Sequence, residues 1–165
     1  MRTAVYAGSF DPLTNGHLWM IERGLEMFDR LYVAIGTNPL KSYTFSVEER
    51  LEQLHASIPS CERLSISEFH NHYLVNYARS VQAQFILRGI RSYTDYEFER
   101  GMRHINNDMA PSITTIFLMP PRDISELSSS MVKGLIGPEG WQDSVRRYVP
   151  APVFESLKEI DLDQD

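Results

Sequence analysis

A short apolar segment passes into an amphipathic one through the run Gly8-Ser9-Phe10-Asp11-Pro12-Leu13-Thr14-Asn15-Gly16-His17. The residues before it, Thr3-Ala4-Val5-Tyr6-Ala7, are uncharged and largely apolar, which predicts a strand covered on both faces. After the run, apolar residues recur at the spacing of one helix face: Leu18, Ile21, Leu25 and Phe28. The run therefore predicts a turn between a buried strand and a helix.

The composition of this turn indicates phosphate chemistry. Its glycines, proline and small polar residues can bring bare backbone N–H groups and a helix N-terminus to one point, which favours an anion. His17 would fall in the first turn of the helix. The run lacks the Gly-Lys-Ser/Thr of a Walker loop and the G-x-G-x-x-G of dinucleotide-binding proteins. It therefore predicts a different design for handling phosphate.

Length and composition limit the classes of protein. A chain of 165 residues suits one domain over residues 1–165, with a final helix at about 151–160 and a tail at 161–165. The net charge of -6 argues against nucleic acid as a partner. The sequence contains no apolar run long enough for a membrane span and no secretory signal. The single cysteine, Cys61, excludes an internal disulfide, and we expect a cytoplasmic protein.

Strands and helices alternate along the whole chain. Further strands are predicted at Leu31–Ile35, Leu64–Ile66, Phe85–Leu87 and Thr114–Leu118. Helices are predicted after two capping boxes that begin at Ser46 and Thr94, on the face formed by Leu74, Tyr77, Ala78 and Val81, from Met131 after a serine cap, and after Pro152. This order predicts an α/β fold: one Rossmann-type, mostly parallel sheet with helices on both faces.

Ligands of such sheets bind outside the carboxyl ends of the strands. The residues that follow the predicted strands suit phosphate: Ser9, Phe10 and His17 after the first, Asn38 and Lys41 after the second, Arg88-Gly89-Ile90-Arg91 after the fourth, and Ser128-Ser129-Ser130 beyond the fifth. Because these strand ends meet at one edge of the sheet, we expect the residues to share a pocket.

Each residue also has a plainer interpretation. His17 could be a polar residue near a helix cap, Lys41 a solvated loop lysine, and Arg88 and Arg91 surface charges. The three serines could serve only as a cap. Glu99 could lie on a solvated helix face. The other histidines lack the spacing of a structural zinc site.

The motifs together resemble the nucleotidylyltransferase superfamily, and within it the phosphopantetheine adenylyltransferase family of bacterial coenzyme A synthesis. Asn15-Gly16-His17 corresponds to the superfamily's T/H-x-G-H element, and the whole run 8–17 is similar to the opening motif of the family. Four further motifs follow in the same order: Phe45-Ser46-Val47-Glu48-Glu49-Arg50, Arg88-Gly89-Ile90-Arg91, Asp95-Tyr96-Glu97-Phe98-Glu99 and Ser128-Ser129-Ser130-Met131-Val132-Lys133. The resemblance extends from about residue 3 to the final helix.

The resemblance implies roles for the matching residues. The acceptor 4'-phosphopantetheine would be held by Ser9, Lys41, Leu74 and Arg88, with Lys41 and Arg88 on its phosphate. ATP would be held by a second set: Ser9, Phe10, His17, Gly89, Ile90, Arg91, Glu99, Ile124, Ser125, Glu126, Leu127, Ser128, Ser129 and Ser130. The family also implies magnesium, a homohexamer, and coenzyme A as a feedback inhibitor.

The sequence departs from the family pattern in three places. Ile124-Ser125-Glu126 replaces an aromatic-Ser-Phe run and adds a carboxylate. Gly134 stands where an acidic residue is usual, and Gly137-Pro138-Glu139-Gly140 is similar to a short insertion. Arg100-Gly101-Met102-Arg103 is more basic than the corresponding family helix. These changes concern nucleotide contacts and assembly more than the transferred phosphate.

The hypothesis is direct adenylyl transfer, in which the acceptor phosphate attacks the α-phosphorus of ATP in line. His17 would stabilise the transition state, Arg91 would take the departing phosphates, and Lys41 and Arg88 would screen repulsion between the reactants. Magnesium would be held by ATP and water, with no protein ligand predicted. Two alternatives remain open: a sister transferase with another acceptor or nucleotide, and a nucleotide-binding protein without activity.

Overall fold

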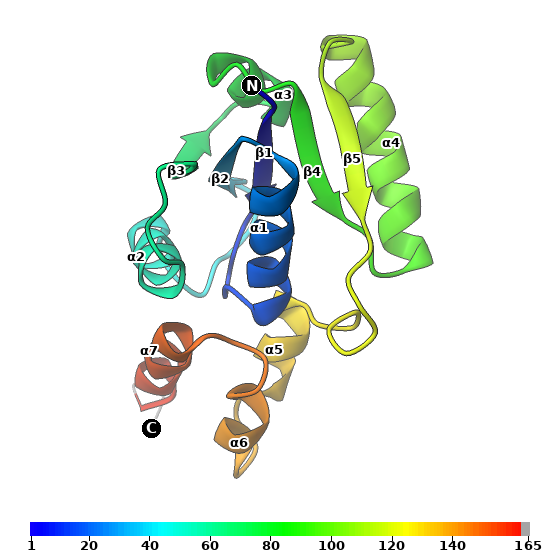
Figure 1. The fold of residues 1–165 in the computed structure, drawn as a ribbon. Coiled ribbons are helices and arrows are strands. Elements are labelled where there is room, and N and C mark those ends of the chain that lie inside the picture. The colour runs from blue at the N-terminus through cyan, green and yellow to red at the C-terminus, as the bar shows by residue number, and fades with distance from the viewer. Residues whose placement is uncertain (163–165) are drawn as a thin grey trace.

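The computed structural model describes the backbone of residues 1–162 and the side chains of residues 1–160. Its centre is a five-stranded sheet, parallel at every pairing, in the order β3-β2-β1-β4-β5 (Figure 1). The strands are β1 (Thr3–Gly8), β2 (Arg30–Thr37), β3 (Leu64–His70), β4 (Phe85–Gly89) and β5 (Thr114–Leu118). The predicted Rossmann-type parallel sheet is confirmed.

Helices cover both faces of the sheet. The described residues form α1 (Asn15–Met27), α2 (Val47–Ser57), α3 (Leu74–Ser80), α4 (Tyr93–Met109), α5 (Ser129–Leu135), α6 (Trp141–Val145) and α7 (Ala151–Leu162). One apolar cluster joins β1 and β2 to α1, α2, α5, α6 and α7, whereas a second joins the opposite face to α3 and the end of α4. The two clusters hold the carboxyl ends of the strands in fixed positions.

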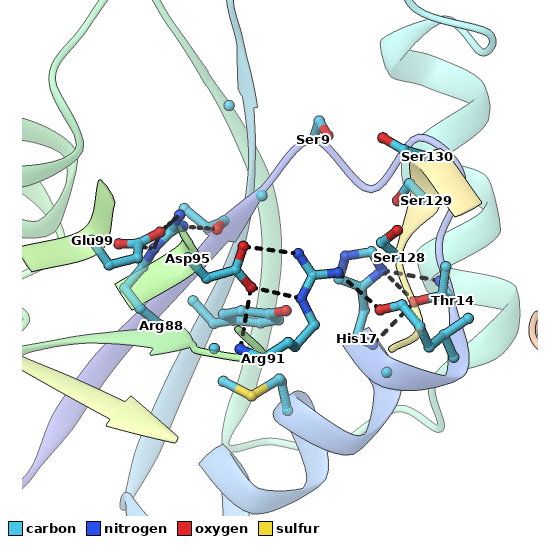
Figure 2. A pocket seen from close by; sticks show the side chains of 18 of the residues that line it. Ser9, Thr14, His17, Arg88, Arg91, Asp95, Glu99, Ser128, Ser129 and Ser130 are labelled. Carbon is cyan, nitrogen blue, oxygen red and sulfur yellow. Dashed lines mark hydrogen bonds and ion pairs between the residues drawn. The ribbon is translucent and has the colours of Figure 1, made fainter. Parts of the chain in front are cut away.

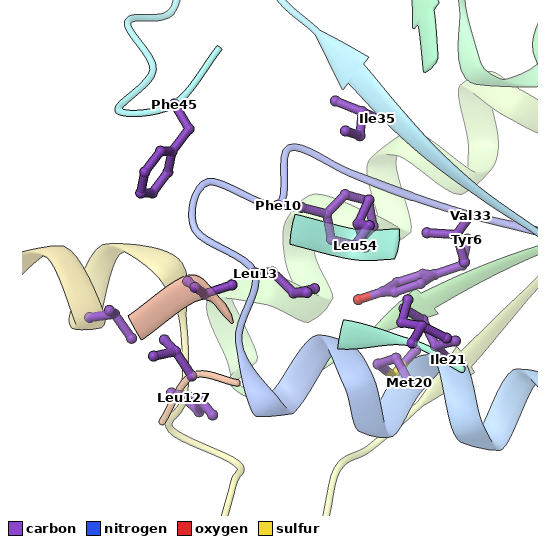
Figure 3. Packing of buried hydrophobic residues seen from close by; sticks show 14 of the residues in the cluster. Tyr6, Phe10, Leu13, Met20, Ile21, Val33, Ile35, Phe45, Leu54 and Leu127 are labelled. Atoms are coloured by element: carbon purple, nitrogen blue, oxygen red, sulfur yellow. The ribbon is translucent and has the colours of Figure 1, made fainter. Parts of the chain in front are cut away.

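The central strand β1 is buried on both faces, as its sequence predicts. Thr3 to Ala7 are all buried, and β1 pairs with β2 on one side and β4 on the other. The chain then turns at Phe10, whose φ of 49° lies in the left-handed region. This turn sends the Phe10 ring into the core, beside Leu13 and edge-on to Tyr6 (Figure 3). Residues 11–14, which complete the turn, are buried as well.

Several predicted boundaries were wrong. The helix predicted from a box at Thr94 begins at Tyr93, because the Ser92 hydroxyl accepts the Asp95 N–H and is the N-cap. Likewise α5 begins at Ser129 rather than Met131, because Ser128 alone is the cap. The final helix continues to Leu162, so the predicted tail begins too early, and residues 163–165 lie outside the described residues.

Two features lie beyond the predicted elements. The strand predicted over Leu64–Ile66 extends to His70, where it still pairs with β2. The short helix α6 was not predicted; it follows Gly137 and Gly140, whose φ angles of 114° and 77° favour glycine. None of the helices in residues 1–162 combines the length and apolar character needed to span a bilayer.

Candidate active site

A cavity of about 680 Å³ opens at the carboxyl ends of β1, β2 and β4. From β1 the chain runs to β2 on one side of the sheet, and the later strand β4 lies on the other side of β1. Such a switch point is where ligands bind in open α/β sheets. The cavity contains most of the predicted site: Ser9, His17, Lys41, Arg88, Gly89, Arg91, Glu99, Ile124, Leu127, Ser128, Ser129 and Ser130. The expected gathering at one sheet edge is thus observed.

His17 is fixed in the cavity by the turn before α1. Its Nδ1 accepts the backbone N–H of Thr14 at 3.0 Å, while the Thr14 hydroxyl accepts the His17 N–H at 3.4 Å (Figure 2). This is a capping box with histidine in the place usually taken by Glu or Gln. The Phe10 ring packs edge-on against the imidazole at 5.1 Å between centroids. The ring therefore has one orientation.

The same contacts decide the protonation of His17. Because Nδ1 accepts a hydrogen bond, the ring proton of the neutral imidazole sits on Nε2. Burial, together with the nearby charge of Arg91, lowers the pKa of His17 to about 4. At neutral pH the side chain is thus an uncharged hydrogen-bond donor, well suited to stabilise charge that develops on a neighbouring oxygen.

Arg91 reaches into the cavity from the end of β4. Its guanidinium contacts the carboxylate of Asp95 at 3.0 Å through Nε and donates to the Leu127 carbonyl at 3.0 Å through Nη1. Asp95 also accepts the backbone N–H of Arg91 at 3.2 Å. The partners come from α4 and from the loop before α5, so two separate segments fix one guanidinium (Figure 2).

Arg88 lies deeper and has a different partner. Its Nε contacts both carboxylate oxygens of Glu99, at 2.9 and 3.0 Å, and its Nη2 also contacts this carboxylate. Nη1 donates to the carbonyl of Ala7 at 2.7 Å. Burial alone would lower the pKa of Arg88, but the hydrogen bonds and charge of Glu99 outweigh it and raise that pKa. Glu99 is thus a buried ion-pair partner in this structure rather than a solvated helix residue.

Ser128, Ser129 and Ser130 have different contacts. Ser128 caps α5, and the Ser129 hydroxyl donates to the Pro12 carbonyl at 2.8 Å, which ties α5 to the glycine-rich turn. Ser130 is exposed and lines the cavity. Lys41 lies in the exposed loop after β2 and also lines the cavity. No salt bridge of Lys41 is found among the described residues, so its ammonium group is available to a ligand.

Comparison with known proteins assigns the family. The profile of the cytidylyltransferase-like family matches residues 5–135. A phosphopantetheine adenylyltransferase from Chromobacterium violaceum is 56% identical over 157 residues, covering 95% of this chain and 96% of its own. The enzyme of the same name from Neisseria meningitidis serogroup B is 58% identical over 156 residues, which cover 94% of this chain and 92% of the Neisseria chain. The chain belongs to the phosphopantetheine adenylyltransferase family.

Solved structures support the same fold at low identity. The nicotinic acid mononucleotide adenylyltransferase of Plasmodium falciparum, complexed with NaAD, superposes with a TM-score of 0.70 at 14% identity, covering 98% of this chain and 96% of its own. A putative nicotinate-nucleotide adenylyltransferase from Vibrio parahaemolyticus gives a TM-score of 0.68 at 18% identity, and the match covers 96% of this chain and 99% of the Vibrio chain. The family assignment and the parallel sheet therefore agree.

Some predicted residues do not line the cavity. Phe10 and Ile90 are buried, at 0% and 8% exposure, so only their backbone could face a ligand. Leu74 packs with the second apolar cluster at the start of α3. Ser125 donates to the Arg122 carbonyl, and Glu126, the carboxylate that departs from the family pattern, is exposed outside the cavity lining.

Several residues that line the cavity were not among the predicted site residues, and three of them bear on its polar groups. Thr14 and Asp95 orient His17 and Arg91, and Tyr43 lines the wall near Lys41. The sequence carried a signal for two of them. Thr14 lies three residues before His17, the spacing of a capping box, and Asp95 lies four residues after Arg91. Tyr43 lies in a polar loop, and no local pattern marks it.

Proposed function

We propose that the protein transfers the adenylyl group of ATP to 4'-phosphopantetheine and releases dephospho-coenzyme A and pyrophosphate. One observation carries the proposal beyond family membership. The cavity holds a neutral imidazole N–H donor, two fixed guanidinium groups, and a lysine that forms no salt bridge with any residue whose side chain is described. This set suits two phosphorylated reactants, one on each side of His17.

The proposed reaction is an in-line displacement. An oxygen of the acceptor phosphate forms a bond to the α-phosphorus of ATP while the bond from that phosphorus to the α,β-bridging oxygen breaks, and pyrophosphate leaves. The attacking phosphate is already ionised, so no protein base has to remove a proton. Catalysis then depends on alignment and on stabilising charge on the nonbridging oxygens. The Nε2–H of His17 is the donor proposed for those oxygens.

The positively charged side chains of the cavity are assigned to two different substrates. We assign Lys41 and Arg88 to the acceptor phosphate, with Ser9 in the turn between them, and Arg91 and Ser130 to the β- and γ-phosphates. Arg88 and Arg91 are each paired with a carboxylate already. Their guanidinium groups are thus held in place before substrate arrives, at the cost of part of their net charge. Lys41, which has no carboxylate partner within residues 1–160, supplies a further positive charge.

Magnesium is proposed as a companion of ATP. Among the described residues no three His, Cys, Asp or Glu side chains are placed to hold a metal ion. The two cavity carboxylates, Asp95 and Glu99, are engaged by arginines. This donor set suits an ion held by phosphate oxygens and water, where it would neutralise phosphate charge.

We further propose a homohexamer in the cytoplasm, inhibited by coenzyme A at the same cavity. Support for assembly comes from α4, which leaves Phe98 and Ile105 exposed at 64% and 50%. Large exposed apolar side chains on one helix are typical of a contact with another chain. Coenzyme A contains the product dephospho-coenzyme A, so it would compete with both substrates.

A substrate panel tests the proposal. Purified protein is mixed with ATP or CTP and, in turn, 4'-phosphopantetheine, nicotinamide mononucleotide and glycerol phosphate, and pyrophosphate release is measured. We expect release with ATP and 4'-phosphopantetheine. Faster release with another pair would identify a sister transferase. Binding of ATP without release under any condition would identify a non-catalytic nucleotide-binding protein.

A further inference from the structure

A buried carboxylate outside the cavity lining joins the glycine-rich turn to two other segments of the site. Asp11 is 2% exposed, and its oxygens accept the backbone N–H of Thr44 at 3.0 and 3.1 Å and that of Phe45 at 2.9 Å. The ammonium group of Lys133, on α5, lies 3.0 Å from its Oδ2. Asp11 itself belongs to the glycine-rich turn. It does not line the cavity, so it is not a ligand for either substrate.

The two backbone contacts lie at the end of the loop that carries Lys41. Residues 38–45 leave β2 and return to α2, and Thr44 and Phe45 close this loop against Asp11. Within the loop, the Asn38 carbonyl accepts the Lys41 N–H at 3.0 Å. The loop is otherwise exposed at Leu40, Lys41 and Ser42. Asp11 is thus the buried anchor of an exposed segment.

A second clamp holds the same loop. The Tyr43 hydroxyl accepts the N–H of Asn38 at 2.8 Å, and the Tyr43 ring lies under the guanidinium of Arg50 at 4.3 Å. Arg50 is 1% exposed and donates to the Ser9 carbonyl at 2.8 Å. The loop is therefore fixed against both ends of the turn between Ser9 and Asp11.

We propose that Asp11 is a positioning residue for the acceptor substrate. By accepting the N–H groups of Thr44 and Phe45, it fixes the position of the loop that carries Lys41. The position of the loop in turn places the ammonium group that binds the acceptor phosphate. The inference rests on the proposed function for the identity of that phosphate. On the ATP side, α5 contacts Asp11 through Lys133 but has a second contact with the turn, because the Ser129 hydroxyl donates to the Pro12 carbonyl.

The test compares Asp11→Asn with the wild type. The amide retains the size of the side chain but presents donors where Thr44 N–H and Lys133 require acceptors. We expect the KM for 4'-phosphopantetheine to rise about tenfold or more, because hydrogen bonds to an ionised group are lost, while the KM for ATP changes less than about twofold. Asp143→Asn, which removes an exposed charge on α6, is the matched control and should change neither value.

A double variant separates positioning from general damage. If Asp11 acts through Lys41, then Asp11→Asn in a Lys41→Ala background should raise the acceptor KM by less than about twofold more. The proposal would be overturned if the fold-changes of the two single variants in the acceptor KM multiply in the double variant. It would also be overturned if Asp11→Asn alone raises the KM values for 4'-phosphopantetheine and ATP equally. Should Asp11→Asn fail to fold, Tyr43→Phe removes one loop bond only. It should raise the acceptor KM about threefold, and an unchanged KM would overturn the proposal.

Hydrogen exchange keeps this inference distinct from the proposed function. In the wild-type protein the amides of Thr44 and Phe45 should exchange more slowly than that of exposed Ser42, and Asp11→Asn should remove the difference. If the wild type releases no pyrophosphate with 4'-phosphopantetheine, the proposed function fails while this exchange pattern still tests the anchor. Fast exchange at Thr44 and Phe45 in the wild type would overturn the anchor itself.

Discussion

Protonation of His17 should destabilise the folded protein. Burial, together with the charge of Arg91, lowers the pKa of His17 to about 4, whereas an imidazole in the unfolded chain titrates near about 6.5. Between these two values the unfolded chain binds a proton that the folded protein does not bind. The free energy of unfolding therefore falls as the pH drops through this window and recovers as the pH rises.

The size of the effect follows from the two pKa values. Near pH 7 the imidazole is mostly neutral in both states, so His17 contributes little pH dependence. Near pH 4.5 the imidazole is almost fully protonated in the unfolded chain and mostly neutral in the folded one. This difference lowers the free energy of unfolding by about 2 kcal/mol through His17 alone. Burial is the main cause of the lowered pKa, and the Thr14 N–H at 3.0 Å from Nδ1 also disfavours the protonated ring, which would place a donor against a donor.

Urea unfolding of the wild type and of His17→Gln, at both pH values, isolates this contribution. Glutamine can take the same position in the capping box but does not titrate. Other titrating groups are common to both proteins, so the difference between their free energies of unfolding reports His17. We expect this difference to move by about 2 kcal/mol in favour of the variant on going from neutral pH to about pH 4.5. A difference that is equal at both pH values would refute the buried neutral imidazole.

Three further predictions concern activity, stability and assembly. His17→Asn retains an acceptor for Thr14 but lacks a donor in the Nε2 position, so kcat for pyrophosphate release should fall about 10²–10³-fold with little change in KM; near-normal steady-state kinetics would contradict the role. Glu99→Gln leaves the Arg88 charge without its partner, and urea unfolding should show a loss of about 2 kcal/mol, which an unchanged midpoint would exclude. Phe98→Glu should lower the mass measured by light scattering to that of a smaller assembly, and an unchanged mass would remove Phe98 from the subunit contact.

The strands of the sheet were predictable where burial makes the sequence uniformly apolar. Residues 3–7 show this, because β1 lies in the middle of the sheet and both its faces are covered. The strand β3 shows the limit. Only Leu64–Ile66 was predicted, yet pairing with β2 carries the strand through Glu68 and Phe69 to His70. The length of an edge strand depends on its neighbour, which a local pattern does not contain.

Helix starts were predictable where only one hydroxyl residue has an acidic residue three positions later. Ser46 caps α2 as its Ser-x-x-Glu pattern predicts, with the Glu49 carboxylate accepting the Ser46 N–H. Near α4 two hydroxyl residues compete, and Ser92 is the cap rather than Thr94. The short helix α6 depends on burial of Trp141 at 4% exposure, a tertiary effect that five residues of sequence do not reveal.

The gathering of the site was predictable, but its pairings were not. A parallel sheet brings every strand end to one edge, which is why His17, Arg88 and Arg91 line one cavity. The sequence could not assign Glu99 to Arg88, because the two side chains meet only when α4 packs beside β4. The fixed partner of each arginine is a property of the folded chain.

These pairings change the interpretation of charge in the cavity. From the sequence, Lys41, Arg88 and Arg91 form a set of cations that attracts two polyanions. In the structure the carboxylates of Asp95 and Glu99 offset two of those charges. What the arginines gain is a fixed geometry, so substrate binding does not have to order them, and donors fixed in advance stabilise a transition state more effectively than mobile ones. Lys41 is the exception, and its position depends on the loop that Asp11 anchors.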